Sequence, residues 1–226
     1  MPRRAESRKE RSHAARERLR PRRPPLQTRS RERVERILDT TVKLLSARGL
    51  DRLSTAEIAE RAGIPIGSIY HYFPSKEAIL AEVAGRKLLA VDAAFTERFA
   101  KDLARAPWRQ ALERAVDASV AAFRSDPAYV ALWQAVRASP TFRSVALDSD
   151  ERFARALEVL PLLSNLPPAR RYVIVRTAIR VANTFTDWVL ETEDLREAAG
   201  IVREMKRALV AYLEPDLESA ARGDRA

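Results

Sequence analysis

The sequence contains no cysteine, two histidines and 6 glycines among its 226 residues. Without cysteine there can be no disulfide, no thiolate redox sensor and no cysteine-based zinc site. His13 and His71 stand far apart, which argues against a multi-histidine metal site. No run approaches the ~18 apolar residues of a membrane span, and no charged-then-apolar secretion leader is visible. We therefore expect a soluble, cytoplasmic protein without a metal or another cofactor.

Residues that favour helices dominate what is present. Alanine, leucine and arginine are abundant, and apolar residues make up 46% of the chain. Strand-like alternation is absent, whereas apolar residues recur at helical spacing between prolines. The sequence therefore predicts an all-α fold of about nine helices. Two short ones are expected within residues 55–73, and the others over 31–48, 75–100, 108–125, 126–138, 148–160, 168–190 and 193–213.

The most informative stretch is TAEIAERAGIPIGSIYHYFPSKE, residues 55–77. Ser54 and Glu57 have the spacing of a capping box, in which each satisfies a backbone donor at the start of a helix. Gly63 supplies a left-handed turn, Pro65 suits the start of a second short helix, and Pro74 ends it. Two short helices joined by a glycine turn are typical of a helix-turn-helix, whose second helix enters the major groove of DNA.

The same stretch carries a family signature, roughly G-x-x-x-G-x-x-Y-x-x-F-x-x-K-E. Its matching positions are Gly63, Gly67, Tyr70, Phe73, Lys76 and Glu77. On these residues, within a longer match from about 31 to 83, the chain resembles the TetR family of bacterial transcriptional regulators. The resemblance implies a three-helix, homeodomain-like head followed by a helical body. It also implies that the last two long helices pair with those of a second copy.

Four regions are expected along the chain. They are a disordered basic arm (1–29), the helix-turn-helix domain (30–83), a helical effector-binding and dimerisation domain (84–214) and a polar tail (215–226). The arm carries most of the net charge of +10, because residues 1–30 hold 11 Lys and Arg against 3 Asp and Glu. Such a segment is suited to contact the DNA backbone. A merely solvated tail, or a start codon assigned too far upstream, is the alternative.

The resemblance assigns the DNA contacts. Thr55 is expected to offer its hydroxyl and backbone N–H to a phosphate. Gly67 is expected to let the protein backbone approach DNA closely, and Lys76 to contact the DNA backbone. For Tyr70 we expect a ring on the core side with an exposed hydroxyl, and for Phe73 a place in the core. The expected DNA-contacting residues are Arg31, Arg33, Thr55, Pro65, Ile66, Gly67, Tyr70, His71, Tyr72 and Lys76.

Two departures from common family usage affect this surface. Pro65 and Ile66 stand where many members have Ser, Thr, Lys or Arg. An apolar side chain can contact a thymine methyl but cannot bond guanine, so we expect weaker hydrogen-bond readout there, partly replaced by contact between Ile66 and thymine. The histidine that usually precedes the phenylalanine is here Tyr72, with His71 one place earlier, so the roles of these two are left open.

The body offers two candidate surfaces. One is an effector pocket, which would be largely apolar with a polar contact from Asn183. Aromatic residues at helical spacing also form ordinary core, which is the alternative. The candidate pocket residues are Trp108, Phe123, Tyr129, Trp133, Phe142, Phe153, Asn183 and Phe185. The last two long helices are apolar over much of their circumference, which calls for cover on two sides. Their expected dimer contacts are Ile174, Ala178, Val181, Trp188, Ile201, Val202, Met205 and Leu209, with burial inside one chain as the alternative.

Taken together, these patterns predict a homodimeric, sequence-specific transcriptional regulator. It would be a repressor released from a palindromic operator in double-stranded DNA by a small-molecule effector. One alternative is an architectural protein that coats DNA without sequence preference. A helical enzyme is disfavoured, because the body has no cysteine or histidine for catalysis.

Overall fold

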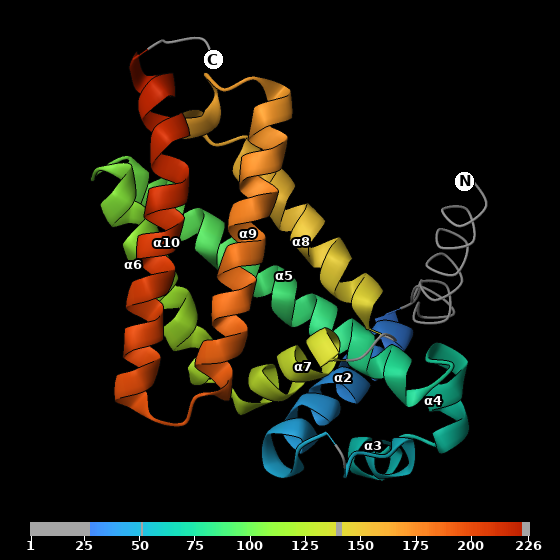
Figure 1. Cartoon of the computed structure of the whole chain (residues 1–226). Coiled ribbons are helices and arrows are strands. Elements are labelled where there is room, and N and C mark those ends of the chain that lie inside the picture. The colour runs from blue at the N-terminus through green and yellow to red at the C-terminus, as the bar shows by residue number, and fades with distance from the viewer. Residues whose placement is uncertain (1–27, 51, 139–141, 223–226) are drawn as a thin grey trace, which may run out of the picture. The chain divides into compact units, whose positions relative to one another are not determined.

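The computed structural model describes residues 28–50, 52–138 and 142–222. Throughout these ranges the secondary structure is helical and no strand occurs, which confirms the all-α prediction (Figure 1). Nine α-helices and one 3₁₀ turn make up the described chain. They are α2 Thr28–Arg48, α3 Thr55–Ala62, α4 Ile66–Tyr72, α5 Lys76–Leu103, α6 Trp108–Arg124, α7 Pro127–Ala138, α8 Arg143–Glu158, η1 Pro161–Leu163, α9 Pro168–Glu191 and α10 Leu195–Arg222. The predicted arm falls outside the described residues as far as residue 27.

The chain divides into two compact units. The first comprises Met1–Leu88 and Asp126–Asp148, and the second Leu89–Ser125 and Ser149–Ala226. Helices α5 and α8 each contribute residues to both. These units differ in extent from the predicted domains, because α7 belongs to the first unit although the sequence placed it in the body.

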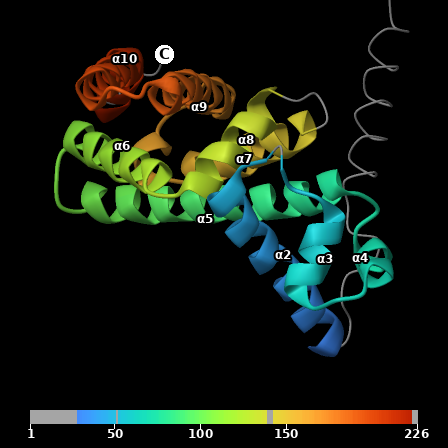
Figure 2. The same cartoon turned by 90° about the horizontal axis from the view of Figure 1, so that it is seen from below.

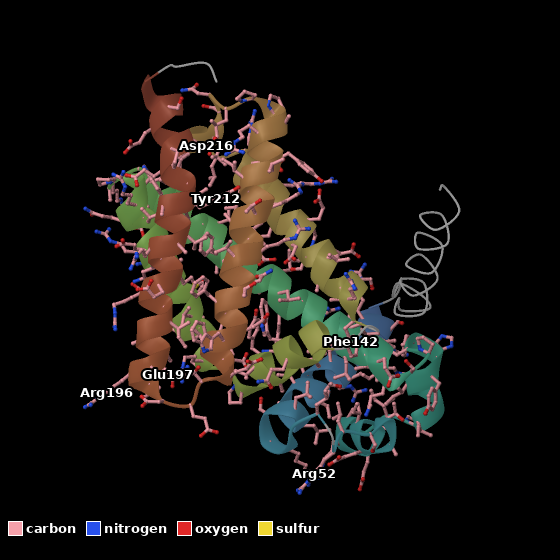
Figure 3. The ribbon with its side chains drawn as sticks, viewed as in Figure 1. Arg52, Phe142, Arg196, Glu197, Tyr212 and Asp216 are labelled. Atoms are coloured by element: carbon pink, nitrogen blue, oxygen red, sulfur yellow. The ribbon has the colours of Figure 1, made fainter. Side chains whose placement is uncertain are left out.

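The core of the first unit forms where α2, α3, α4, the start of α5 and α7 meet (Figure 2). Its fully buried side chains include Ile37, Leu45, Ile58, Ile69, Phe73 and Ile79. Helix α7 adds Ala128 and Leu132 to this cluster, and Phe142 joins it just before α8 (Figure 3). Burying a side chain of this size is worth roughly 1.5–3 kcal/mol, so this core holds the two short helices in place.

The second unit is built around the long pair α9 and α10, which run side by side (Figures 1 and 2). Apolar residues of α5, α6, α9 and α10 form one cluster, and a second gathers around η1 and the C-terminal part of α10. Both clusters follow the helical spacing seen in the sequence.

Helix α10 extends nine residues beyond its predicted end at residue 213, and Pro215 lies inside it. A proline in a helix removes one backbone donor and costs about 3 kcal/mol, so other contacts must offset this cost. Here, tertiary contacts hold the last turns. Leu217 is buried, and Arg170 on α9 makes two bonds of 2.7 and 2.8 Å to the Asp216 carboxylate (Figure 3). The predicted polar tail is therefore helical as far as Arg222.

Candidate nucleic-acid interface

The first helix of the motif begins where the sequence predicted, with the Ser54 half of the expected capping box, while the Glu57 side chain binds elsewhere. Ser54 is the N-cap of α3, and its hydroxyl accepts a 3.2 Å bond from the backbone N–H of Glu57. The Glu57 carboxylate forms an ion pair with Arg48 at the end of α2. The cap thus fixes the start of α3, and the ion pair ties it to the preceding helix.

The turn between the two helices depends on Gly63. Its φ of 62° and ψ of 40° lie in the left-handed region, where a residue with a Cβ is strained. The N–H groups of Gly63 and Ile64 donate to the carbonyls of Glu60 and Ala59 at 3.2 and 3.0 Å, which satisfies the open end of α3. Pro65 then precedes α4 as its N-cap.

Helix α4 has one buried face and one exposed face. Ile69 and Tyr72 are buried, and Phe73 directly after the helix is fully buried. The opposite face presents Ile66 and Tyr70, which are 45% and 43% exposed, together with Gly67 and His71. This spacing follows from the helical repeat, in which residues three and four apart share a face.

The two tyrosines take different positions from those expected. Tyr72 is 6% exposed, and its hydroxyl accepts a 3.2 Å bond from Ser30 on α2, so it belongs to the core of the head. Tyr70, whose ring was expected on the core side, lies on the exposed face. Phe73 occupies the core as expected. His71 is exposed and meets the Tyr72 ring edge-on, with the ring centroids 5.1 Å apart.

Polar groups gather where α3 and α4 approach one another. The hydroxyls of Thr55 and Tyr70 lie 3.1 Å apart, within hydrogen-bonding distance. Thr55 is the first residue of α3, where backbone N–H groups lack helical partners and favour an anion. A pair of hydroxyls at such a helix end can bind a phosphate oxygen.

The predicted cations lie on other elements of the first unit. Arg31 and Arg33 are exposed in the first turns of α2. Lys76 is half-buried, and its ammonium group donates a 3.1 Å bond to the Leu53 carbonyl. An ammonium group has three donors, so this bond orients Lys76 and leaves capacity for a phosphate.

The predicted pocket residues are divided between the two units. Tyr129, Trp133 and Phe142 belong to the first unit, and the other five to the second. Tyr129 and Trp133 stack with centroids 5.9 Å apart. Together with Ala84, Lys87, Leu88 and Leu132 they line a hollow of about 10 Å³, room for about one water.

Sequence reasoning missed Asp92, which lies in the second unit on the face of α5 that carries Phe95 and Phe99. Ser149 on α8 donates a 2.9 Å bond to its carboxylate. Desolvation by burial, opposed by the Ser149 bond and reinforced by Asp150, raises the pKa of Asp92 to about 6. The signal was available, because a lone acid interrupts the helical stripe Leu88, Asp92, Phe95 and Phe99. Asn183, the predicted polar contact, donates a 3.0 Å bond to Asp150.

The predicted dimer residues fall into three groups according to their exposure. Ile174, Ile201, Met205 and Leu209 are buried within one chain, so they pack inside the second unit. Ala178, Val181 and Val202 are half-buried. Trp188 is 52% exposed, and Tyr172, Val173 and Leu195 on the same two helices are exposed as well.

Two kinds of feature are absent from the described ranges. No helix there is long and apolar enough to cross a membrane. No group of three or more His, Cys, Asp or Glu side chains is placed to hold a metal ion in the same ranges.

Known families match both parts of the chain. "Bacterial regulatory proteins, tetR family" matches residues 37–83, which contain the motif. "Tetracyclin repressor-like, C-terminal domain" matches residues 107–213.

Individual proteins show the same similarity. The transcriptional repressor KstR of Mycolicibacterium smegmatis is 41% identical over 63 residues, which are 28% of this chain and 31% of KstR. The regulator EthR of the same organism is 31% identical over 113 residues, 50% of this chain and 51% of EthR. The chain thus spans about a third to a half of these relatives. A TetR-family regulator from Streptomyces coelicolor has a crystal structure with a TM-score of 0.60 and 28% identity, covering 81% of this chain and 98% of that one.

Proposed function

The chain belongs to the TetR family of bacterial transcriptional regulators, and we propose that it is a homodimeric repressor released from a palindromic operator by a small molecule. Family membership confirms the resemblance and identifies a helix-turn-helix, DNA-binding regulator of transcription rather than an enzyme. It also implies operator DNA and a small-molecule effector as partners. The palindromic symmetry of the operator, the direction of regulation, the homodimer and the cytoplasmic location of the protein belong to the proposal.

The main observation in support of the proposal is the exposed face of α4. A short helix held by a buried face, a capped neighbour and a glycine turn presents Ile66, Gly67, Tyr70 and His71 outward. A major groove admits a helix of this size. The hydroxyls of Thr55 and Tyr70 would hold a phosphate beside it and so fix the register of the helix on the duplex.

Two-fold assembly is supported by the outer side of α9 and α10. Trp188 and Leu195 are 52% and 70% exposed, and large apolar groups left in water favour burial against a partner. Two identical heads related by a two-fold axis read a palindromic site. Repression is supported by the similarity to KstR, which is a transcriptional repressor.

Effector control is assigned to the second unit. The Asp92 carboxylate lies on the same helix face as Phe95 and Phe99. Phe95 meets Phe153 edge-on at 5.3 Å. A small molecule that binds one arrangement of these helices more tightly than another shifts the population of the dimer and weakens operator binding.

The test is selection of DNA bound by the full-length protein from a random pool at fixed salt, followed by footprinting. The proposal expects one short symmetric site, protected at a ratio of two chains per site. Protection that spreads along any duplex would identify a sequence-independent coating protein instead. A protein that binds one site as a single chain would refute the dimer.

A further inference from the structure

The exposed face of α4 lacks the side chains that usually read bases. The segment from Pro65 to Tyr72 contains no arginine, lysine, asparagine, glutamine or acidic residue. Guanine is commonly read by two bonds from arginine or lysine, and adenine by two bonds from asparagine or glutamine. Neither pairing is available to this segment.

An apolar side chain, that of Ile66, occupies the exposed start of α4 instead. Ile66 is the first residue of α4 and is 45% exposed, next to the exposed Pro65. The protein gains little from an isoleucine in water, because its apolar surface is stabilising only when buried. Contact with a partner would provide that burial.

Gly67 supplies a second, independent observation. A Cβ added there would meet no atom of the protein within 4 Å, and its φ is not in the positive range. Neither packing nor backbone geometry therefore requires glycine at this position, although glycine in a helix costs ~1 kcal/mol relative to alanine. The missing side chain leaves the surface beside Ile66 open to close approach by a partner.

We propose that Ile66 reads the 5-methyl group of a thymine in each half of the operator, with Gly67 admitting the duplex close enough for contact. The inference rests on the proposed function, in which α4 enters the major groove. The thymine methyl lies at the edge of that groove, and apolar side chains contact it there. 5-Methylcytosine carries the same methyl in a C·G pair, so methyl recognition can be separated from recognition of the T·A pair.

The experiment starts from the site selected by the full-length protein. Each thymine is replaced in turn by deoxyuridine, which removes only the methyl group, and affinity is measured by fluorescence anisotropy at fixed salt. One symmetric pair of thymines should respond, with about fourfold weaker binding per half-site, as expected for ~0.8 kcal/mol of lost methyl burial. The other thymines are the internal control. 5-Methylcytosine at the responding position should bind more tightly than cytosine.

Three variants assign the effect to the side chain. Ile66→Ala should bind the thymine and deoxyuridine sites equally, whereas Ile66→Val should keep most of the discrimination. Val159→Ala removes an exposed apolar side chain from the second unit and should discriminate as the unchanged protein does. Unfolding curves should be unaltered for all three.

The outcomes separate the two claims. Loss of discrimination in Ile66→Ala alone supports methyl readout. A selected site at which no deoxyuridine weakens binding, or equal discrimination by Ile66→Ala, overturns the inference and leaves the regulator intact. A selection that returns no preferred site overturns the proposed function together with the inference.

Discussion

The carboxyl group of Asp92 should make the folded protein less stable above about pH 6, so its neutralisation should stabilise the protein there. Burial raises the pKa of Asp92 from 3.8 to about 6. Between these values the unfolded chain has released this proton while the folded chain retains it. The contribution of the group to stability is therefore fully present below about pH 4 and is lost as the pH rises through 6.

The size of the loss follows from the shift. About two pKa units at 1.36 kcal/mol each give up to ~3 kcal/mol. Asp92→Asn keeps an oxygen that can accept the 2.9 Å bond from Ser149 and carries no charge at any pH. We expect Asp92→Asn to be more stable than the unchanged protein by up to ~3 kcal/mol near pH 8, with the difference disappearing near pH 4.

Urea unfolding followed by tryptophan fluorescence at a series of pH values, and at one protein concentration, measures this difference. Asp126→Asn is the matched control. Burial acts to raise the pKa of Asp126, but bonds from Lys87 and from the backbone N–H of Tyr129 lower it overall. Removing the charge of Asp126 should therefore destabilise the protein above pH 4, whereas Asp92→Asn should stabilise it. The reasoning is refuted if Asp92→Asn is less stable near pH 8, or if its effect is the same at every pH.

Three further outcomes are expected. Gly67→Ala should stabilise the fold by up to ~1 kcal/mol and yet weaken operator binding, as measured by thermal unfolding and anisotropy; tighter binding would contradict the close approach. Tyr70→Phe should weaken DNA binding with little change in stability, whereas Tyr72→Phe should lower stability by ~1 kcal/mol with little change in affinity, and equal behaviour of the two would contradict their placement. Deletion of residues 1–29 should reduce affinity and flatten its dependence on salt; an unchanged slope would exclude a DNA contact by the arm.

Local signals in the sequence predicted local structure well. Ser54 and Gly63 determine where α3 starts and ends, because a side-chain acceptor and a left-handed turn act on the residues beside them. Apolar spacing also predicted the number of helices and most of their ranges, because it too depends only on residues that are close together in the sequence. The family signature then located the helix that we propose faces DNA, without any knowledge of packing.

Contacts distant in sequence could not be predicted in this way. Helix α10 continues past Pro215 because Arg170 and Arg109 bind acidic groups of its last turns. The spacing of residues along α10 does not reveal that these two arginines lie beside it. Helix α7 joins the first core because Ala128 and Leu132 pack in it, although its place in the sequence put it within the predicted body, residues 84–214. In both cases tertiary packing outweighed a local rule.

The positions of Tyr70 and Tyr72 depend both on local sequence and on contacts with distant residues. Once α4 begins after Pro65, burial of Ile69 sends Tyr72 and Phe73 to the same side, three and four residues on. Ile66 and Tyr70, three residues before and one after Ile69, are then left on the outer face. The residues on the exposed face of α4 are therefore fixed by where the turn ends and which residue is buried. A one-residue change in turn length should rotate α4 by about 100° and so move Ile69 away from the core, weakening operator recognition and core packing together.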